Sequence, residues 1–212
     1  MKKTYAISGI LAPLFYISAV IVGSLMRPGY SQISQTISEL IESGAPNKTL
    51  LDLLFIFYNS LIIVFGYWLF KQLKVKGKYS IQVGAVMLLI TGVLGLAMTM
   101  FFPMDPRGSE ATLPGMIHLI LAGVILLLTI LTILFTGFGF KDFPLLANFK
   151  LYSLITAIVA VASGGMAAFS AFTESAYMGL FERITIGAFL QWIFVVALRL
   201  FLVRVKEEAV TN

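Results

Sequence analysis

The chain contains no cysteine and a single histidine, and only 12% of its 212 residues are charged. The lack of cysteine excludes disulfides, thiol nucleophiles and thiolate metal sites. The charged fraction is about half of the roughly 25% that is usual for soluble domains. Because 59% of the residues are hydrophobic and the mean hydropathy is +0.96, the composition predicts a protein that is solvated by lipid.

Six apolar stretches are long enough to cross a membrane as helices, which takes about 20 residues each. They cover residues 5–26, 50–70, 81–102, 115–135, 151–172 and 184–203. Backbone polar groups inside a bilayer must be satisfied within helices. We therefore predict an all-α membrane protein, with six transmembrane helices in one bundle and a single domain over residues 1–212. We expect the first stretch to stay as an anchor, because its apolar part is too long for a signal peptide.

The charged residues sort by side of the predicted bundle. One side holds Lys2, Lys3, Lys71, Lys74, Lys76, Lys78, Lys141, Lys150, Arg199, Arg204 and Lys206, with Asp142, Glu207 and Glu208. The other side holds Glu39, Glu42, Asp52, Asp105, Glu110, Glu174 and Glu182, with Arg27, Lys48, Arg107 and Arg183. Basic loops stay in the cytoplasm, so both termini are predicted there. The basic side would contact anionic membrane lipids, and the charge gives no reason to expect nucleic acid as a partner.

The first extracytoplasmic loop, residues 27–48, is longer than a simple connection requires. Its apolar residues recur at helical spacing, which predicts a short amphipathic helix on the membrane surface or over the mouth of the bundle. These residues are Ile33, Ile37, Leu40 and Ile41. On such a helix Glu39 would lie at the edge of the apolar stripe and could face the bundle, whereas Glu42 would point away into solvent.

The other two loops on this side add candidate site residues. Prolines on both sides of Asp105 restrict the backbone, so its carboxylate is expected in a fixed position. His118 falls about one turn into the fourth span and should be partly buried. Glu182 and Arg183 open the sixth span, where the helix dipole favours a carboxylate.

Several segments together resemble a bacterial membrane family, domain of unknown function 998. They are Arg27-Pro28-Gly29-Tyr30-Ser31, Ile37-Ser38-Glu39-Leu40, Gly44-Ala45-Pro46-Asn47, Phe102-Pro103-Met104-Asp105-Pro106, His118, Glu182-Arg183 and Trp192. The chain departs from the family at Ile41, where members carry glycine. The resemblance covers nearly the whole chain and implies a location in the bacterial cytoplasmic membrane. It supplies no substrate, because the family has no established activity.

The candidate residues allow four interpretations. A metal site could use His118 with Asp105, Glu39 or Glu182, but the paired helical spacing of known sites is missing, and we predict no metal or other cofactor. A hydrolase could use Ser38 as nucleophile, His118 as base and Asp105 as the orienting group. No nucleophile-elbow motif accompanies Ser38.

A ligand site is the third interpretation, and a structural clamp is the fourth. Arg27 or Arg183 could bind an anionic headgroup, with the other polar residues around it. The expected ligand-binding residues are Arg27, Tyr30, Ser38, Glu39, Asp105, His118, Glu182 and Arg183. Alternatively, Arg183, Asp105, Glu39 and His118 satisfy one another and hold the surface helix to the bundle.

The spans carry no charged residue near the bilayer midplane, which argues against an ion-coupled transporter. Their central polar residues are expected to form hydrogen bonds between helices. These residues are Asn59, Ser60, Thr91, Ser163 and Gln191. We rank binding of a lipid or amphipathic molecule first, a lipid-modifying or hydrolytic enzyme second, and a transporter of a neutral or hydrophobic substrate third. A homo-oligomer is compatible with all three.

Overall fold

The computed structural model describes residues 5–72, 79–141, 143 and 146–202, and it confirms the six predicted helices. They are α1 (Ala6–Met26), α2 (Lys48–Gln72), α3 (Ser80–Phe101), α4 (Leu113–Phe140), α5 (Phe149–Phe172) and α6 (Met178–Leu202). All six are long and apolar enough to cross a membrane. The main change in bounds is at α6, which begins six residues before the predicted start at residue 184, so that Glu182 and Arg183 lie inside the helix.

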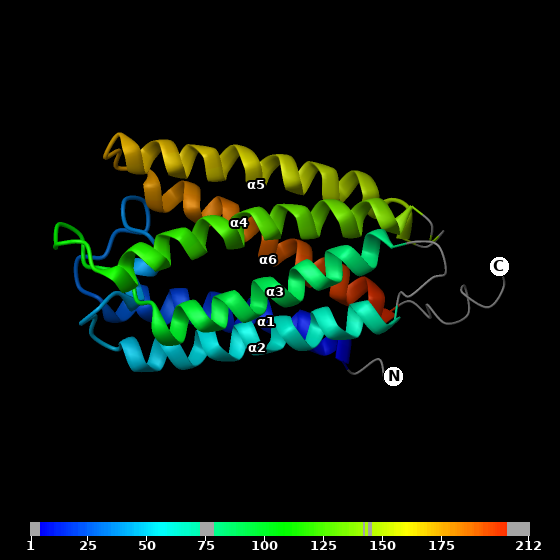
Figure 1. Cartoon of the computed structure of the whole chain (residues 1–212), viewed down its shortest axis with the longest axis horizontal. Coiled ribbons are helices and arrows are strands. Elements are labelled where there is room, and N and C mark those ends of the chain that lie inside the picture. The colour runs from blue at the N-terminus through cyan, green and yellow to red at the C-terminus, as the bar shows by residue number, and fades with distance from the viewer. Residues whose placement is uncertain (1–4, 73–78, 142, 144–145, 203–212) are drawn as a thin grey trace.

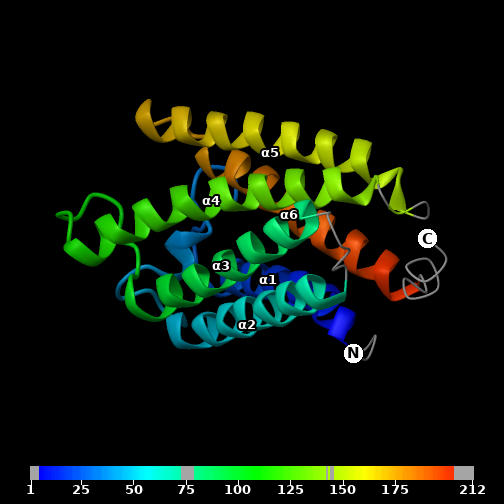
Figure 2. The same cartoon turned by 45° about the vertical axis from the view of Figure 1, so that its right-hand side comes forward.

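The helices form a closed ring in chain order, in which each one packs against the next and α6 returns to α1 (Figures 1 and 2). Glycines allow close approach between neighbours in the ring. A Cβ on Gly92 would lie 2.7 Å from Ile63 of α2, and one on Gly139 would lie 2.2 Å from Ile81 of α3. The core between the helices is apolar and includes the fully buried Trp192 and Phe65.

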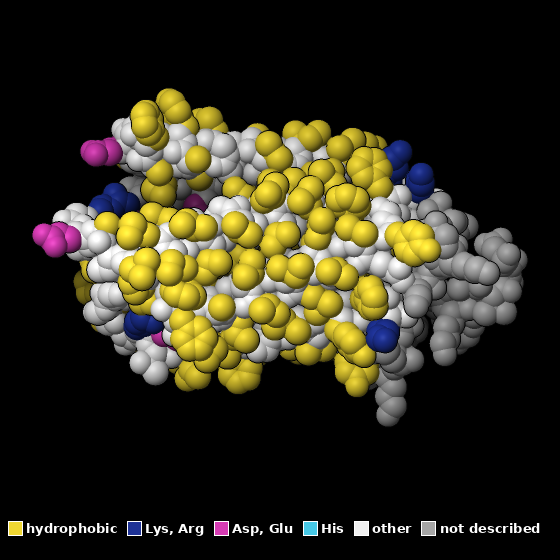
Figure 3. Space-filling model, viewed as in Figure 1, with side chains coloured by type: hydrophobic (Ala, Val, Ile, Leu, Met, Phe, Trp, Pro, Cys, Tyr) yellow, Lys and Arg dark blue, Asp and Glu magenta, His cyan; other side chains and the backbone are white. Residues whose placement is uncertain are grey.

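The two ends of the bundle differ in charge. The acidic end carries the loops at residues 27–47, 102–112 and 173–177, and the basic end carries the start of α1 and the end of α6 (Figures 1 and 3). Lys71, Lys141, Lys150 and Arg199 lie at or near the basic end. The other charged residues predicted for that side lie outside the described residues: Lys2, Lys3, Lys74, Lys76, Lys78, Asp142, Arg204, Lys206, Glu207 and Glu208.

The helices α4 and α5 touch in the basic half of the bundle and diverge toward the acidic end (Figures 1 and 2). A Cβ on Gly137 would lie 2.3 Å from Ser153, and one on Gly164 would lie 3.1 Å from Leu126. Leu119 lies five turns before Gly137 and therefore points in the same direction, toward α5. It is nevertheless 60% exposed. This difference along one face defines an α4–α5 gap at the acidic end.

The first loop contains a single 3₁₀ turn, η2 (Ser38–Ile41), where the sequence predicts a longer amphipathic helix. Side chains bond to the backbone before it, and such bonds compete with helix formation. The Ser31 amide donates to the Gln35 side chain at 2.8 Å, and the Thr36 amide donates to Glu39 at 3.1 Å. Ile37, Leu40 and Ile41 are buried against α1 and α2, whereas Ile33 is 52% exposed.

Candidate functional site

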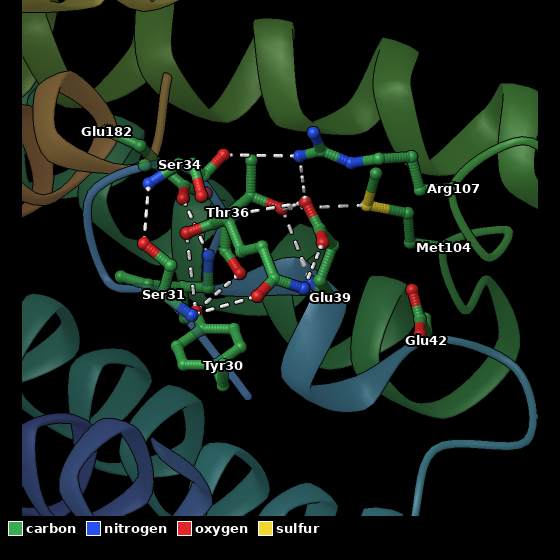
Figure 4. Close-up of polar contacts among 12 residues, drawn as sticks. Tyr30, Ser31, Ser34, Thr36, Glu39, Glu42, Met104, Arg107 and Glu182 are labelled. Carbon is green, nitrogen blue, oxygen red and sulfur yellow. Dashed lines mark hydrogen bonds and ion pairs between the residues drawn. The ribbon is translucent and has the colours of Figure 1, made fainter. Parts of the chain in front are cut away.

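A network of polar contacts at the acidic end joins the first loop to the α3–α4 loop and to α6 (Figure 4). We call it the loop network. It contains Arg27, Tyr30, Gln35, Thr36, Ser38, Glu39, Glu42, Met104, Arg107, His118, Glu182 and Arg183. The partners of the first loop in this network lie on the α3–α4 loop, α4 and α6, so the first loop lies as a cover on the mouth of the bundle.

Glu39 is the most highly bonded carboxylate of the network and faces the bundle, as the sequence allowed. It accepts from Arg107 at 2.7 Å and from Gln35 at 3.0 Å, besides the amide of Thr36. Its side chain is 2% exposed and that of Arg107 is 60% exposed. Burial acts to raise the pKa of Glu39, but the hydrogen bonds from Arg107, Thr36 and Gln35 outweigh it and hold the pKa below its usual value.

Glu42 is buried, so the prediction that it is solvated was wrong. The prediction assumed a continuous helix, in which Glu42 would point away from the apolar stripe. Instead, the chain is extended at Glu42 after the 3₁₀ turn, and the carboxylate forms an ion pair with Arg27. Arg27 also donates to the backbone carbonyl of Glu39. Glu110, on the α3–α4 loop, is exposed.

Arg183 is held by the first loop through two backbone carbonyls and a phenol. It donates to Gln35 O at 2.8 Å, to Gly179 O at 3.0 Å and to the hydroxyl of Tyr30 at 2.5 Å. The Tyr30 hydroxyl donates in turn to Thr36 O at 2.7 Å. Burial raises the pKa of Tyr30 to about 12, and the nearby Arg183 only partly opposes this rise. Both side chains therefore serve to fix the loop on α6.

His118 is fully buried and lies between the backbone of Phe102 and the side chain of Ser38. Its Nδ1 is 2.7 Å from the carbonyl oxygen of Phe102, and its Nε2 is 3.0 Å from the hydroxyl of Ser38. Because the Phe102 carbonyl can only accept, Nδ1 carries the proton and Nε2 accepts from Ser38. The predicted contact between Ser38 and His118 is thus present, with a carbonyl on the other ring nitrogen where Asp105 was expected.

Asp105 bonds to Thr112, the residue just before α4, and takes no part in the loop network. Its two oxygens accept from the amide and the hydroxyl of Thr112, at 2.8 and 2.7 Å. These hydrogen bonds hold its pKa below the usual value. A Cβ on Gly115 would lie 1.9 Å from the Asp105 carboxylate, so the turn requires glycine at that position. The expected fixed position is therefore observed, with Thr112 as the partner.

The structure brings together most of the predicted site residues, but apart from Ser38 and His118 they form other pairs than expected. Arg183, Asp105, Glu39 and His118 do not bond to one another. Arg107, which was counted only as a charge of the acidic end, is the partner of Glu39. Its place beside Asp105 in a proline-restricted loop was the signal that could have identified it. Within the described residues, no group of three His, Asp or Glu side chains is arranged to hold a metal ion.

Comparisons with known proteins place the chain in a family but do not supply an activity. No curated protein matches the chain, and no solved structure does. A family model described as "Protein of unknown function (DUF998)" matches residues 10–199, which is most of the chain and includes all six helices in whole or in large part. With its six helices that can cross a membrane, the chain is a multi-pass membrane protein, and it belongs to the DUF998 family, as its sequence predicted.

Proposed function

We propose that the protein binds a lipid or another amphipathic molecule at its acidic end, and that this end faces away from the cytoplasm of a bacterial cell. The α4–α5 gap is the observation that carries the proposal. Its walls are apolar and include the exposed Leu119 of α4 and the exposed Ala168 and Ala171 of α5. Figure 3 shows the gap as a hollow that opens on the flank of the bundle, where a chain from the surrounding lipid can enter.

The gap ends near the middle of the bundle, where three helices meet. Gly164 of α5 lies against Leu126 of α4 and near Thr185 of α6, and the Thr185 hydroxyl donates to Ser163 at 2.8 Å. Along α4, the distance from Leu113 to this floor is about 20 Å at 1.5 Å per residue. An alkyl chain of ordinary length fits such a gap, with its polar end at the level of the loop network.

The arginines do not support an anionic headgroup, which the sequence left open as a partner of Arg27 or Arg183. Arg27 is paired with Glu42, and both terminal nitrogens of Arg183 are bonded to the protein. A role in holding the first loop therefore accounts for Arg27, Tyr30, Glu39 and Arg183, in place of the predicted clamp in which Arg183, Asp105, Glu39 and His118 satisfy one another. In our proposal these residues build the rigid rim of the site, and the ligand occupies the gap beside them.

A bulky side chain in the gap tests the binding proposal. Ala168→Trp places an indole on the α5 wall, while Ile158→Trp places the same group on an exposed part of α5 below the gap. We expect lipid that copurifies with the wild type, counted by native mass spectrometry, to be lost from Ala168→Trp and retained by Ile158→Trp. Equal lipid occupancy in both variants would contradict the proposal.

The orientation has a separate test, which the lack of cysteine makes simple. Ser43 and Lys150 are exposed at opposite ends of the bundle. A cysteine at Ser43 should react with a membrane-impermeant maleimide in intact cells, and a cysteine at Lys150 should react only after lysis. Labelling of Lys150→Cys from outside intact cells would reverse the proposed topology.

Hydrolysis of an acyl ester is the second candidate function, favoured by the contact between Ser38 and His118. With Nδ1–H held by the Phe102 carbonyl, Nε2 can take the Ser38 proton as the hydroxyl oxygen attacks an ester carbonyl. Ser38 itself is partly exposed. The arrangement of a nucleophile, a base and an orienting group is the feature that acyl transfer requires.

A long-chain fluorophosphonate tests the hydrolase candidate, because an activated serine oxygen displaces its fluoride and becomes covalently phosphonylated. We expect the label on Ser38, found by peptide mass spectrometry, and its loss in His118→Ala. Ser43→Ala, at an exposed serine of the same loop, serves as the control. If Ser38 stays unlabelled and the protein releases no fatty acid from ester lipids, binding alone is supported.

A further inference from the structure

Glu182 differs from Glu39 and Glu42, the other carboxylates of the loop network, in forming no ion pair with a described residue. Glu39 is paired with Arg107, and Glu42 is paired with Arg27. Glu182 accepts one hydrogen bond, from the amide of Ile37 to Oε2 at 2.7 Å. Its Oε1 accepts no hydrogen bond from the described residues and is not among the buried atoms. The residue as a whole is partly exposed.

The adjacent Arg183 does not neutralise Glu182 by direct contact. Its guanidinium is turned to Tyr30, over whose ring it lies at 5.5 Å from the centroid, and it is bonded to Gln35 O and Gly179 O. Glu182 is therefore a carboxylate on a membrane helix with one open oxygen. Ionisable groups at such depth are costly unless they are paired, and they commonly mark functional sites.

The position of Glu182 relates it to the α4–α5 gap. It lies on α6 one turn above Thr185, whose hydroxyl bonds to Ser163 of α5 at the floor of the gap. It also lies about 6 Å below the first residue of α6, because each helical residue adds 1.5 Å. Figure 4 shows Glu182 where α6 meets the first loop beside α4, and Figure 3 shows acidic and basic side chains within the hollow.

From this geometry we infer that the ligand is a cationic amphiphile, in which an ammonium group is attached directly to the alkyl chain and pairs with Glu182. The inference rests on the proposed binding function and names its ligand class. An ammonium supplies hydrogen-bond donors and the missing positive charge, and charge-assisted bonds are the stronger ones. In an aminophospholipid the phosphate would lie between the ammonium and the chains. It would then sit deeper than Glu182, against the apolar walls of the gap.

Three probes with the same twelve-carbon chain test the inference: dodecylamine, dodecanol and laurate. They differ only in the charge and donors of the polar end. Binding to the purified full-length protein in nonionic micelles is measured by native mass spectrometry, with dioleoylphosphatidylethanolamine as a fourth probe. We expect dodecylamine to bind about tenfold more tightly than dodecanol, as one charge-assisted hydrogen bond provides, and laurate to bind most weakly.

Two variants assign the preference to Glu182. Glu182→Gln keeps an acceptor for the Ile37 amide but removes the charge, so the ammonium and hydroxyl probes should bind within about twofold of each other. Glu110→Gln, which removes an exposed charge from the same end, should keep the tenfold preference. Equal preference in wild type and Glu182→Gln would overturn the inference, as would tighter binding of laurate or of the phospholipid. Failure of every probe to bind would instead contradict the proposed function.

Discussion

The two sides of the acidic end are held by different forces. Over α1, the α3–α4 loop and α6, the first loop is fixed by ion pairs and hydrogen bonds from Arg27, Arg107 and Arg183. On the side of α5, Gly164 lies against Leu126 of α4, whereas Leu119, which lies nearer the acidic end on the same face of α4, is exposed. One side is therefore a bonded cover, and the other is an opening toward lipid.

This difference indicates a division of roles within one end of the bundle. Polar groups that are paired inside the protein contribute to stability and rigidity, because breaking a buried pair leaves a charge without a partner. An apolar gap contributes little to stability but can accept a ligand. Glu182 lies where the two sides meet, with one oxygen bonded to the cover and the other open. Changes on the two sides should therefore have different consequences.

Removal of Glu39 should have the largest effect, because it breaks the bonded side. Glu39→Ala removes the acceptor of the Gln35 side-chain amide and of the Thr36 backbone amide, and it leaves the Arg107 guanidinium with only the Ser34 carbonyl. We expect the free energy of unfolding in mixed micelles to fall by about 3 kcal/mol. Glu110→Ala, at an exposed position, should change it by no more than about 0.5 kcal/mol. Equal values for the two variants would show that the loop network does not stabilise the fold.

A methyl group on Gly115 should have the next largest effect, because it would overlap the Asp105 carboxylate. Gly115→Ala must push Asp105 away from Thr112, and we expect a loss of about 2 kcal/mol in unfolding free energy. Gly123→Ala is the matched control on α4, since its Cβ would meet no atom within 4 Å. A cost at Gly123 as large as that at Gly115 would mean that α4 tolerates no added methyl group and that the Asp105 turn is not special.

The sequence predicted the helices well because a span is decided by composition over about 20 residues, and small errors at the ends do not change it. It located Glu39 in the first loop and His118 about one turn into the fourth span for the same reason, since both positions follow from where the spans end. It failed at Glu42, because the direction of a side chain in a loop depends on each backbone angle. The assumed α-helix is a 3₁₀ turn followed by extended chain.

The pairing of charges could not be predicted from the sequence. Arg107 and Glu39 are 68 residues apart, and four cations and several carboxylates at the acidic end allow many combinations. The choice depends on how the α3–α4 loop turns over the first loop, which the contact between Ser43 N and Met104 O helps to fix. Nor did the spans reveal the α4–α5 gap, because Leu119 and Gly137 are apolar residues on one face and differ only in their neighbours.

Low pH should selectively weaken the side of the acidic end on which ion pairs and hydrogen bonds hold the first loop. Because the folded state lowers the pKa of Glu39, its contribution to stability is complete above the unfolded value of about 4.3 and is lost as pH falls through the folded value. The stability difference between wild type and Glu39→Gln, measured by unfolding at pH 6 and pH 3, should therefore shrink at pH 3. A constant difference would show that the charge of Glu39 does not contribute to the stability of the loop network.

The smallest effect is expected at the floor of the α4–α5 gap, where two adjacent glycines allow a matched comparison. A Cβ on Gly164 would lie 3.1 Å from Leu126, whereas one on Gly165 would meet no atom within 4 Å. Gly164→Val should therefore lower the free energy of unfolding by about 1 kcal/mol through overpacking, and Gly165→Val should be neutral. If the two variants were equally stable, α4 and α5 would already be apart at Gly164 and the opening would extend deeper toward the basic end. If both variants were destabilised, α5 would also be closely packed on the side of Gly165 that faces lipid. A bound chain would then have to displace protein to enter the gap.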